Sequence, residues 1–273
     1  MILKTLNSLA KIYADRELDD RFIQNEGCML QNEAFSFQVA FKLEENSDPA
    51  KAAFGFSVDI PEELKPYTRI KAIDYVPCDY TLYPPCLGLS DHPEQGLFPD
   101  ILRDIPTIYW ASTNSWRGVY ITIDAQNACL KPGIYTIKTI FKYKGEYTKE
   151  FRIEVLDAKL PPQSIPVTNW FHTDCLCNYY HVEFDSKEYW RITENFAKTA
   201  VHYGINMLLM PVFTPPLDTG VGYERRTIQL VDVFKDGDKY SFGFRKLRKW
   251  VKMCKRVGVK YYEISHLFTQ WGC

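Results

Sequence analysis

The stretch Val167-Thr-Asn-Trp-Phe-His-Thr-Asp174 decides the fold, because its pattern returns twice later in the chain. Each time, an apolar strand-like run ends in a cluster of aromatic, His, carboxylate and hydroxyl side chains. The later instances are Met207-Leu-Leu-Met-Pro-Val-Phe-Thr-Pro-Pro-Leu-Asp218 and Tyr261-Tyr-Glu-Ile-Ser-His-Leu-Phe268. Polar groups at the C-terminal ends of parallel strands are where α/β folds build their active sites. We therefore expect a functional site where these three strands end.

Two helices are predicted between the three strands, because apolar residues recur there with a period of 3.6. Asp185 and Glu188 are the expected capping pair of the first helix, and Ser241 is the expected cap of the second. A Gly follows each helix, at Gly204 and Gly258, as is common where helices end. The apolar stripes are Tyr189, Ile192, Phe196, Ala200 and Tyr203, then Phe244, Leu247, Val251 and Cys254. The order strand–helix–strand–helix–strand suits a TIM barrel or an open doubly wound sheet.

The chain before residue 157 alternates with a period of two instead. Phe35, Phe37, Val39 and Phe41 share one face of a predicted strand. Residues 77–106, rich in Pro, Tyr, Asp and Gly, are predicted as a long ordered loop packed on the neighbouring domain or a ligand. The other predicted strands cover 54–60, 69–76, 119–123, 134–143 and 147–155. So many short strands at this spacing indicate an antiparallel β-sandwich.

The predicted organisation is multi-domain, with an antiparallel β-sandwich followed by the first β/α units of a TIM (β/α)8 barrel. The sandwich covers residues 1–157, a Pro-rich linker covers 158–166, and the partial barrel covers 167–273. Three prolines in the linker predict a stiff connection. No helix follows the third strand before Cys273, so we expect an incomplete barrel and an N-terminal fragment of a longer protein.

Composition excludes several classes of function. Lys plus Arg (33) nearly equals Asp plus Glu (34), which argues against nucleic acid and acidic membranes as partners. No signal peptide or transmembrane run is apparent, so a cytoplasmic location is expected. Cys175 and Cys177 form only a weak zinc signal, and no metal or cofactor is predicted. Nucleophile-elbow, P-loop, His-Glu-x-x-His and dinucleotide-binding motifs do not occur. Nothing in the sequence sets an oligomeric state.

The side chains at the three strand ends suit sugar recognition. Indoles stack on the apolar faces of pyranose rings, while carboxylates, amides and hydroxyls bond the sugar hydroxyls. Each residue also has a purely structural interpretation: buried His, a solvated charge run at 224–226, or Trp packing inside a barrel. The same placement at three strand ends favours function. The candidate substrate-binding residues are Trp170, His172, Asp174, Thr214, Asp218, Glu224, Arg225, Glu263, His266 and Trp271.

These segments resemble glycoside hydrolase family 123, including the related domain of unknown function 4091. The resemblance lies in Asn169-Trp-Phe-His-Thr-Asp-Cys-Leu176, Phe213-Thr-Pro-Pro-Leu-Asp-Thr219, Glu224-Arg-Arg-Thr-Ile-Gln-Leu-Val231 and Ile264-Ser-His-Leu-Phe-Thr-Gln-Trp-Gly272. Upstream, Asp74-Tyr-Val-Pro77 and Gly96-Leu-Phe-Pro-Asp100 are similar to the sandwich domain of that family. The resemblance covers nearly the whole chain.

The resemblance implies a β-sandwich followed by a TIM barrel that acts on glycosides. Characterised members are β-N-acetylgalactosaminidases that use substrate-assisted hydrolysis, an exception to the two-carboxylate scheme. In them an Asp orients the acetamido group of the substrate and the adjacent Glu is the acid/base. This pair belongs to a later strand, and no Asp-Glu dipeptide occurs in residues 158–273. No catalytic residue is therefore carried over, and the fragment itself is expected to be inactive.

Two alternatives remain open at this point. The first is a non-catalytic carbohydrate-binding or interaction protein, which uses the sandwich and the aromatic loop around Tyr83 and Phe98. The second is a fragment without independent function. In that case three parallel strands leave an unpaired edge and apolar faces, and we expect residues 158–273 to be poorly soluble alone.

Overall fold

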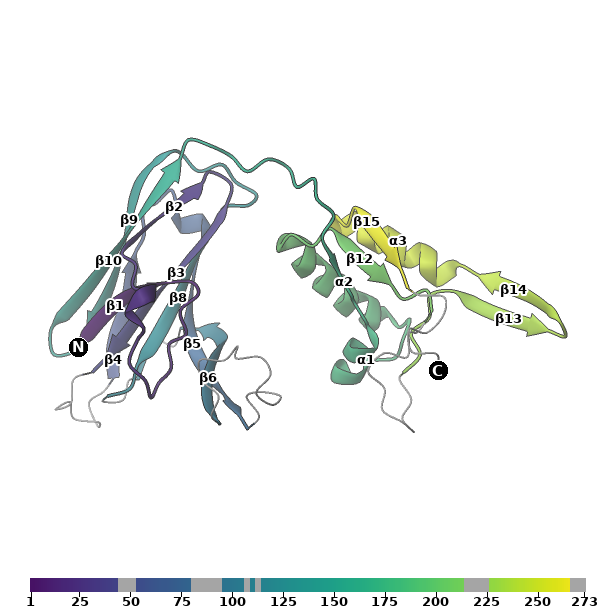
Figure 1. The fold of residues 1–273 in the computed structure, drawn as a ribbon, viewed down its shortest axis with the longest axis horizontal. Coiled ribbons are helices and arrows are strands. Elements are labelled where there is room, and N and C mark those ends of the chain that lie inside the picture. The colour runs from purple at the N-terminus through teal and green to yellow at the C-terminus, as the bar shows by residue number, and fades with distance from the viewer. Residues whose placement is uncertain (44–52, 80–94, 106–108, 111–113, 214–225, 266–273) are drawn as a thin grey trace. The chain divides into compact units, whose positions relative to one another are not determined.

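The structure is a computed structural model that describes residues 1–43, 53–79, 95–105, 109–110, 114–213 and 226–265. The chain divides into two compact units, Met1–Pro161 and Pro162–Cys273. Strands dominate the first unit, and the second combines strands with helices (Figure 1). Among the described helices, none has both the length and the apolar character needed to cross a membrane.

Two five-stranded sheets make up the first unit. The first sheet has the order β1 (Ile2–Asn7), β3 (Ala34–Lys42), β8 (Arg117–Asp124), β5 (Thr68–Cys78) and β6 (Gly96–Asp104). The second has the order β2 (Glu26–Leu30), β10 (Glu146–Leu156), β9 (Gly133–Lys142), β4 (Ala53–Asp59) and β7 (Tyr109–Trp110). Short 3-10 turns at Asp20–Phe22 and Lys65–Tyr67 complete the unit.

A phenylalanine core joins the two sheets. The predicted face of β3 is correct at its centre, since Phe37, Val39 and Phe41 are fully buried. Phe37 stacks on Phe151 of β10 with ring centroids 4.0 Å apart, and Phe41 lies 5.1 Å from Phe141 of β9. Alternation along the strands therefore places one aromatic row from each sheet in a shared core.

Two expectations for the first unit are wrong. Residues 77–106 are not one long loop, because β6 is a strand that pairs with β5 across a register shift at Asp74/Tyr75. Part of that predicted loop, residues 80–94, lies outside the described residues. The strand set is also not purely antiparallel, since β2 pairs with β10 in parallel. The two strands are far apart in the sequence, so no tight hairpin fixes their relative direction.

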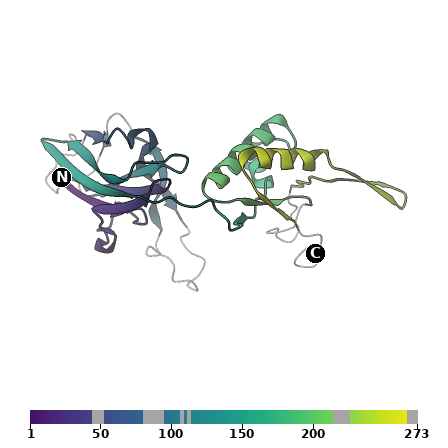
Figure 2. The same cartoon turned by 90° about the horizontal axis from the view of Figure 1, so that it is seen from above.

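The second unit contains a three-stranded parallel sheet in the order β11 (Thr168–Asn169), β12 (Met207–Met210) and β15 (Tyr261–Ile264). Helices α1 (Asp174–Tyr180) and α2 (Lys187–His202) connect β11 to β12. In the sequence, two further elements separate β12 from β15. They are the hairpin of β13 (Asp232–Asp236) and β14 (Lys239–Gly243), and then the helix α3 (Arg245–Val257). Helices α2 and α3 cover the same face of the sheet, as Figure 2 shows, and Trp250 and Tyr189 are fully buried in the core there.

Both helix-cap predictions are wrong. Ser186, not Asp185, caps α2, because its Oγ accepts the N–H of Tyr189 at 3.1 Å. Asp185 has a positive φ of 63° and its carboxylate accepts a hydrogen bond from the indole of Trp190 instead. Ser241 does not cap α3, since it belongs to strand β14 and α3 begins without a side-chain cap. The alternating run 239–243 obeys the strand period, which overrides the local capping signal.

Asn206 fixes the N-terminal ends of the parallel strands. Its Oδ1 accepts the N–H of Val167 at 2.8 Å, and its Nδ2 donates to the carbonyl of Ile165 at 3.0 Å. Its backbone carbonyl accepts the N–H groups of Lys260 and Tyr261. This buried side chain therefore ties the chain before β11 and the start of β15 to the start of β12.

Candidate functional site

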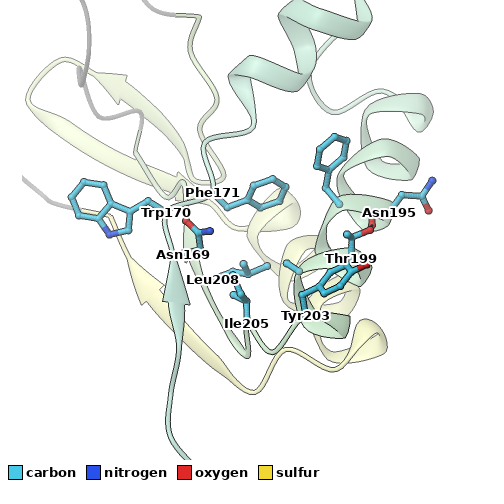
Figure 3. Close-up of a pocket in the computed structure, with 10 residues that line it drawn as sticks. Asn169, Trp170, Phe171, Asn195, Thr199, Tyr203, Ile205 and Leu208 are labelled. Atoms are coloured by element: carbon cyan, nitrogen blue, oxygen red, sulfur yellow. The ribbon is translucent and has the colours of Figure 1, made fainter. Parts of the chain in front are cut away.

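Successive side chains of the segment after β11 project to opposite sides of the sheet. Figure 3 shows the ring of Phe171 directed toward α2 and the indole of Trp170 on the other side of the strand. The register places Thr168 opposite Met207 and Asn169 opposite Leu208. Since side chains alternate, Thr168 and Trp170 belong to the sheet face that α2 and α3 leave uncovered. In a barrel, this face is the interior.

Glu263 of β15 lies on the same face and binds both residues. Its Oε2 accepts the hydroxyl of Thr168 at 2.6 Å, and its Oε1 accepts the indole N–H of Trp170 at 3.1 Å. The carboxylate thereby spans the middle strand β12, whose Leu209 pairs with Glu263. A carboxylate offers about four lone-pair sites, so acceptor capacity remains for a ligand hydroxyl.

The indole of Trp170 is positioned but still accessible. Trp170 is 44% exposed, although its indole N–H donates a hydrogen bond to Glu263. The imidazole of His172 approaches it edge-on, with ring centroids 6.2 Å apart. An indole that is fixed through its N–H and remains partly exposed is suited to stacking on the apolar face of a sugar ring.

The carboxylate of Asp174 is not exposed beside Trp170 and Glu263. It is the first residue of α1 and is buried, at 7% exposure. Thr173 before it is also buried, and its hydroxyl lies 2.8 Å from that of Tyr189. The segment after Trp170 therefore turns into the helix-side core within a few residues.

The structure brings together three of the predicted site residues: Trp170, His172 and Glu263. The predicted residues that lie outside the described part of the chain are Thr214, Asp218, Glu224, Arg225, His266 and Trp271. Arg226, next to two of them, forms an ion pair with Glu183 at 2.8 Å. Across the described ranges, no three His, Cys, Asp or Glu side chains are grouped so that they could hold a metal ion.

Sequence reasoning missed Thr168 and Ser265. Thr168 could have been found from the alternation that places it on the same side as Trp170. Ser265 follows β15, and its buried hydroxyl lies 3.2 Å from the N–H and 3.3 Å from the carbonyl of Phe213. It therefore links the C-terminal ends of β12 and β15, and no local motif indicates such a contact.

An apolar pocket of about 410 Å³ lies on the helix side, between β11 and α2 (Figure 3). Asn169, Trp170, Phe171 and Leu208 line it from the strand side, and Phe196, Thr199 and Tyr203 line it from α2 and its C-terminal cap. Its walls carry few polar atoms and no acidic or basic side chain. This mostly apolar pocket has no carboxylate to accept sugar hydroxyls, so the polar cluster around Glu263 is the better candidate site.

Comparison with known proteins shows which family the chain resembles. Residues 170–273 match the family model "Glycoside hydrolase 123, catalytic domain". The fold is similar to that of a family 123 glycoside hydrolase from Clostridium perfringens, whose structure was solved to explain glycolipid glycan hydrolysis. The TM-score is 0.70 at 14% sequence identity, over 95% of this chain and 46% of that one. The resemblance to family 123 is thus confirmed, and this chain spans about half the length of that relative.

Other similarities are too weak to carry an argument. A Bacteroides ovatus GH5 xyloglucanase matches with a TM-score of 0.26 at 8% identity, over 91% of this chain and 45% of that one. The fimbrial subunit AggA from Escherichia coli also has a TM-score of 0.26 at 8% identity, over 57% of this chain and 93% of that one. Among curated proteins, no significant match to the chain was found.

Proposed function

We propose that these 273 residues form the N-terminal β-sandwich and the first β/α units of a TIM-barrel glycoside hydrolase specific for β-N-acetylgalactosaminides. The observation that carries this function is the exposed indole of Trp170, which Glu263 fixes at the C-terminal ends of the parallel strands. The match of residues 170–273 to a family 123 catalytic domain supports a glycoside as the ligand. The Clostridium relative acts on a glycolipid glycan, which supports a glycan of this class, and the amino sugar is what the resemblance to family 123 implies.

Within this site, we assign substrate binding and not bond cleavage to the residues present. Trp170 stacks on the sugar ring, and the free lone pairs of Glu263 accept sugar hydroxyls. The acid/base of family 123, as the resemblance implies, is the Glu of an Asp-Glu pair that residues 158–273 do not contain. We therefore propose that this chain binds the glycoside without hydrolysing it, and that the full family 123 protein supplies the catalytic pair.

The test is a titration of the 273-residue chain with methyl β-N-acetylgalactosaminide, followed by calorimetry and by tryptophan fluorescence. Removal of an aromatic ring that stacks on a nucleic-acid base costs about 1–3 kcal/mol, and by analogy Trp170→Ala should weaken sugar binding about 10-fold or more. Trp170→Phe, which keeps a ring, is the matched control and should retain most of the affinity. Equal binding by the wild-type chain and Trp170→Ala would contradict the assigned site.

Hydrolysis is assayed separately with an aryl β-N-acetylgalactosaminide. We expect no turnover by this chain, and measurable turnover would show that a catalytic group lies among these residues. The same titration distinguishes the alternative, a carbohydrate-binding protein that uses its first unit. In that unit Phe98 already packs edge-on against Tyr13 at 5.7 Å, which reduces the area it offers to a sugar. Binding unaffected by Trp170→Ala and reproduced by residues 1–161 would favour this alternative.

A further inference from the structure

The hairpin β13–β14 projects beyond the end of α3, away from the three-stranded sheet (Figures 1 and 2). It is closed by the two-residue turn Gly237-Asp238, and Gly237 has a φ of 58°. Gly at the first of two turn positions is typical of a type II′ turn, which matches the twist of the flanking strands. The hairpin is therefore a regular element with defined register, from Asp236 opposite Lys239 to Asp232 opposite Gly243.

The register determines which backbone groups point outward. A two-residue turn closes on a hydrogen-bonded pair, here Asp236 and Lys239, and bonded and non-bonded pairs then alternate along the ladder. Phe242, paired with Val233, and Tyr240 are therefore in non-bonded pairs. Their N–H and carbonyl groups face the outer edge of β14.

One face of the hairpin is exposed and carries three apolar side chains. Val233, Phe242 and Tyr240 share this face with Lys235, and these three are 43%, 55% and 58% exposed. The ammonium group of Lys235 lies over the ring of Tyr240 at 5.7 Å. A lone two-stranded hairpin is marginally stable in water, and a sheet of three or more strands with an apolar face is stable. Three exposed apolar side chains on one face make the hairpin a candidate interaction surface.

The two edges of the hairpin differ in their ability to pair with a second copy. If β13 paired antiparallel with β13 of another chain at full overlap, Asp232 would lie opposite Asp236 at both ends, and like charges directly opposite are destabilising. In the same arrangement of β14, Lys239 lies opposite Gly243 and Tyr240 lies opposite Phe242. Aromatic cross-strand pairs are stabilising. Charge and side-chain complementarity therefore select the β14 edge.

The backbone groups agree with this register. With β14 pairing centred on Ser241, the outward N–H groups of Tyr240 and Phe242 donate to the carbonyls of Phe242 and Tyr240 in the other copy. We propose that β14 pairs antiparallel with β14 of a second copy of this chain, about a twofold axis at Ser241. The resulting sheet of four strands places both copies of Val233, Tyr240 and Phe242 on one face, together with both copies of Lys235.

The first test is the mass of the 273-residue chain in solution, measured by sedimentation equilibrium over a range of concentrations. We expect a dimer for the wild type and a twofold fall in mass for Phe242→Pro, because Pro removes the outward N–H on the β14 edge. Val233→Pro is the matched control. Its side chain lies on the same face as Phe242, but the N–H that it removes points outward from the β13 edge. It should remain dimeric.

Two results would overturn the dimer. One is a wild-type chain that stays monomeric at every concentration tested. The other is the same dissociation in both Pro variants, with circular dichroism showing that both remain folded. A monomeric wild type that loses glycan affinity when Phe242 becomes Ala would assign the hairpin to a ligand instead.

The second test locates the axis. In the proposed pairing the two Ser241 residues form a non-bonded pair with Cα atoms about 4.5 Å apart, within the span of a disulfide. Ser241→Cys should therefore form a 241–241 linked peptide, identified by mass spectrometry above the background from exposed thiols such as Cys28 and Cys129. Tyr240→Cys, whose partner is Phe242, should not link to itself. Equal linkage in both variants would contradict this register.

Discussion

At the scale of single residues, Glu263 is a positioning residue for the candidate sugar platform. Its carboxylate bonds Thr168 and Trp170 at the same time, so that one side chain fixes the indole relative to the strands. An indole that rotated freely would lose this freedom on ligand binding, at an entropic cost of about 0.5–1.5 kcal/mol. Pre-organisation by Glu263 therefore reduces the entropic cost of ligand binding.

We expect Glu263→Ala to weaken binding of methyl β-N-acetylgalactosaminide about 5- to 10-fold, since both the orientation of Trp170 and an acceptor for the sugar are lost. Glu263→Gln keeps one acceptor oxygen and should show a smaller loss. Calorimetry measures the affinities, and near-ultraviolet circular dichroism reports the order of the indole. Unchanged affinity in Glu263→Ala would separate Glu263 from the site.

Asn206 is a polar residue whose loss should destabilise the second unit. Asn206→Ala removes the partners of the Val167 N–H and the Ile165 carbonyl, and it should lower the free energy of unfolding by about 2–3 kcal/mol. Urea denaturation measures the change. Asn195→Ala, on the exposed face of α2, is the control and should change stability by less than about 0.5 kcal/mol. Equal effects of the two substitutions would contradict the role of Asn206.

At the scale of elements, an ion-pair network joins α2 to α3. Glu194 accepts hydrogen bonds from Arg256 at 2.6 Å, and Lys198 lies 3.2 Å away. The Arg256 guanidinium, with help from Lys198, lowers the pKa of Glu194 from its ordinary value of 4.5 to about 2, although partial burial opposes the shift. Glu194 is thus ionised at any pH where the protein is ordinarily studied.

The depressed pKa predicts a pH dependence of stability. A carboxyl group with a lower pKa in the folded state stabilises the fold fully above its unfolded pKa, and this contribution is lost as the pH falls from about 4.5 to about 2. Because the pair is partly exposed, it contributes no more than about 1 kcal/mol. Glu194→Gln should lower stability by that amount at pH 7 and flatten the pH profile in this window. Parallel wild-type and variant profiles would show that Glu194 is not the group responsible.

The element scale also shows what sequence reasoning can reach. Strands such as β3, β9 and β10 were predictable, because an alternating apolar row keeps its period along the whole strand. The strand β6 was not, since its run Gly96-Leu-Phe-Pro-Asp100 contains the turn-forming residues Gly and Pro. The hairpin β13–β14 was also missed, because its aromatic residues face solvent and resemble the start of the helix stripe that includes Phe244.

Of the candidate site, Trp170 and Glu263 were predictable as strand-end residues. Their contact was not, because it crosses the middle strand.

At the scale of the whole molecule, each unit has its own core. Among the described residues, the second unit has more exposed large apolar side chains than the first. In its described part, β11 and β15 each have one strand neighbour, and Trp170, Phe196 and Tyr203 are exposed beside the apolar pocket. Unpaired strand edges and apolar patches promote association between chains.

We therefore expect residues 162–273, expressed alone, to aggregate at concentrations where residues 1–161 remain monodisperse. Phe196→Lys on the exposed side of α2 should raise the solubility of the second unit, because it places a charge in the apolar patch without touching the buried face of the helix. Light scattering measures both effects. The control Lys198→Gln on the same helix should bring no such gain. A monodisperse, cooperatively melting second unit would refute the expectation.

The position of Asn206 has a consequence for how this sheet can change in evolution. Asn206 holds the strands together at their N-terminal ends, whereas Trp170 and Glu263 lie toward the opposite ends. Stability and the proposed ligand recognition therefore depend on different ends of the same three strands. With the proposed site at the C-terminal ends, substitutions there change the ligand preference while the strands keep their register.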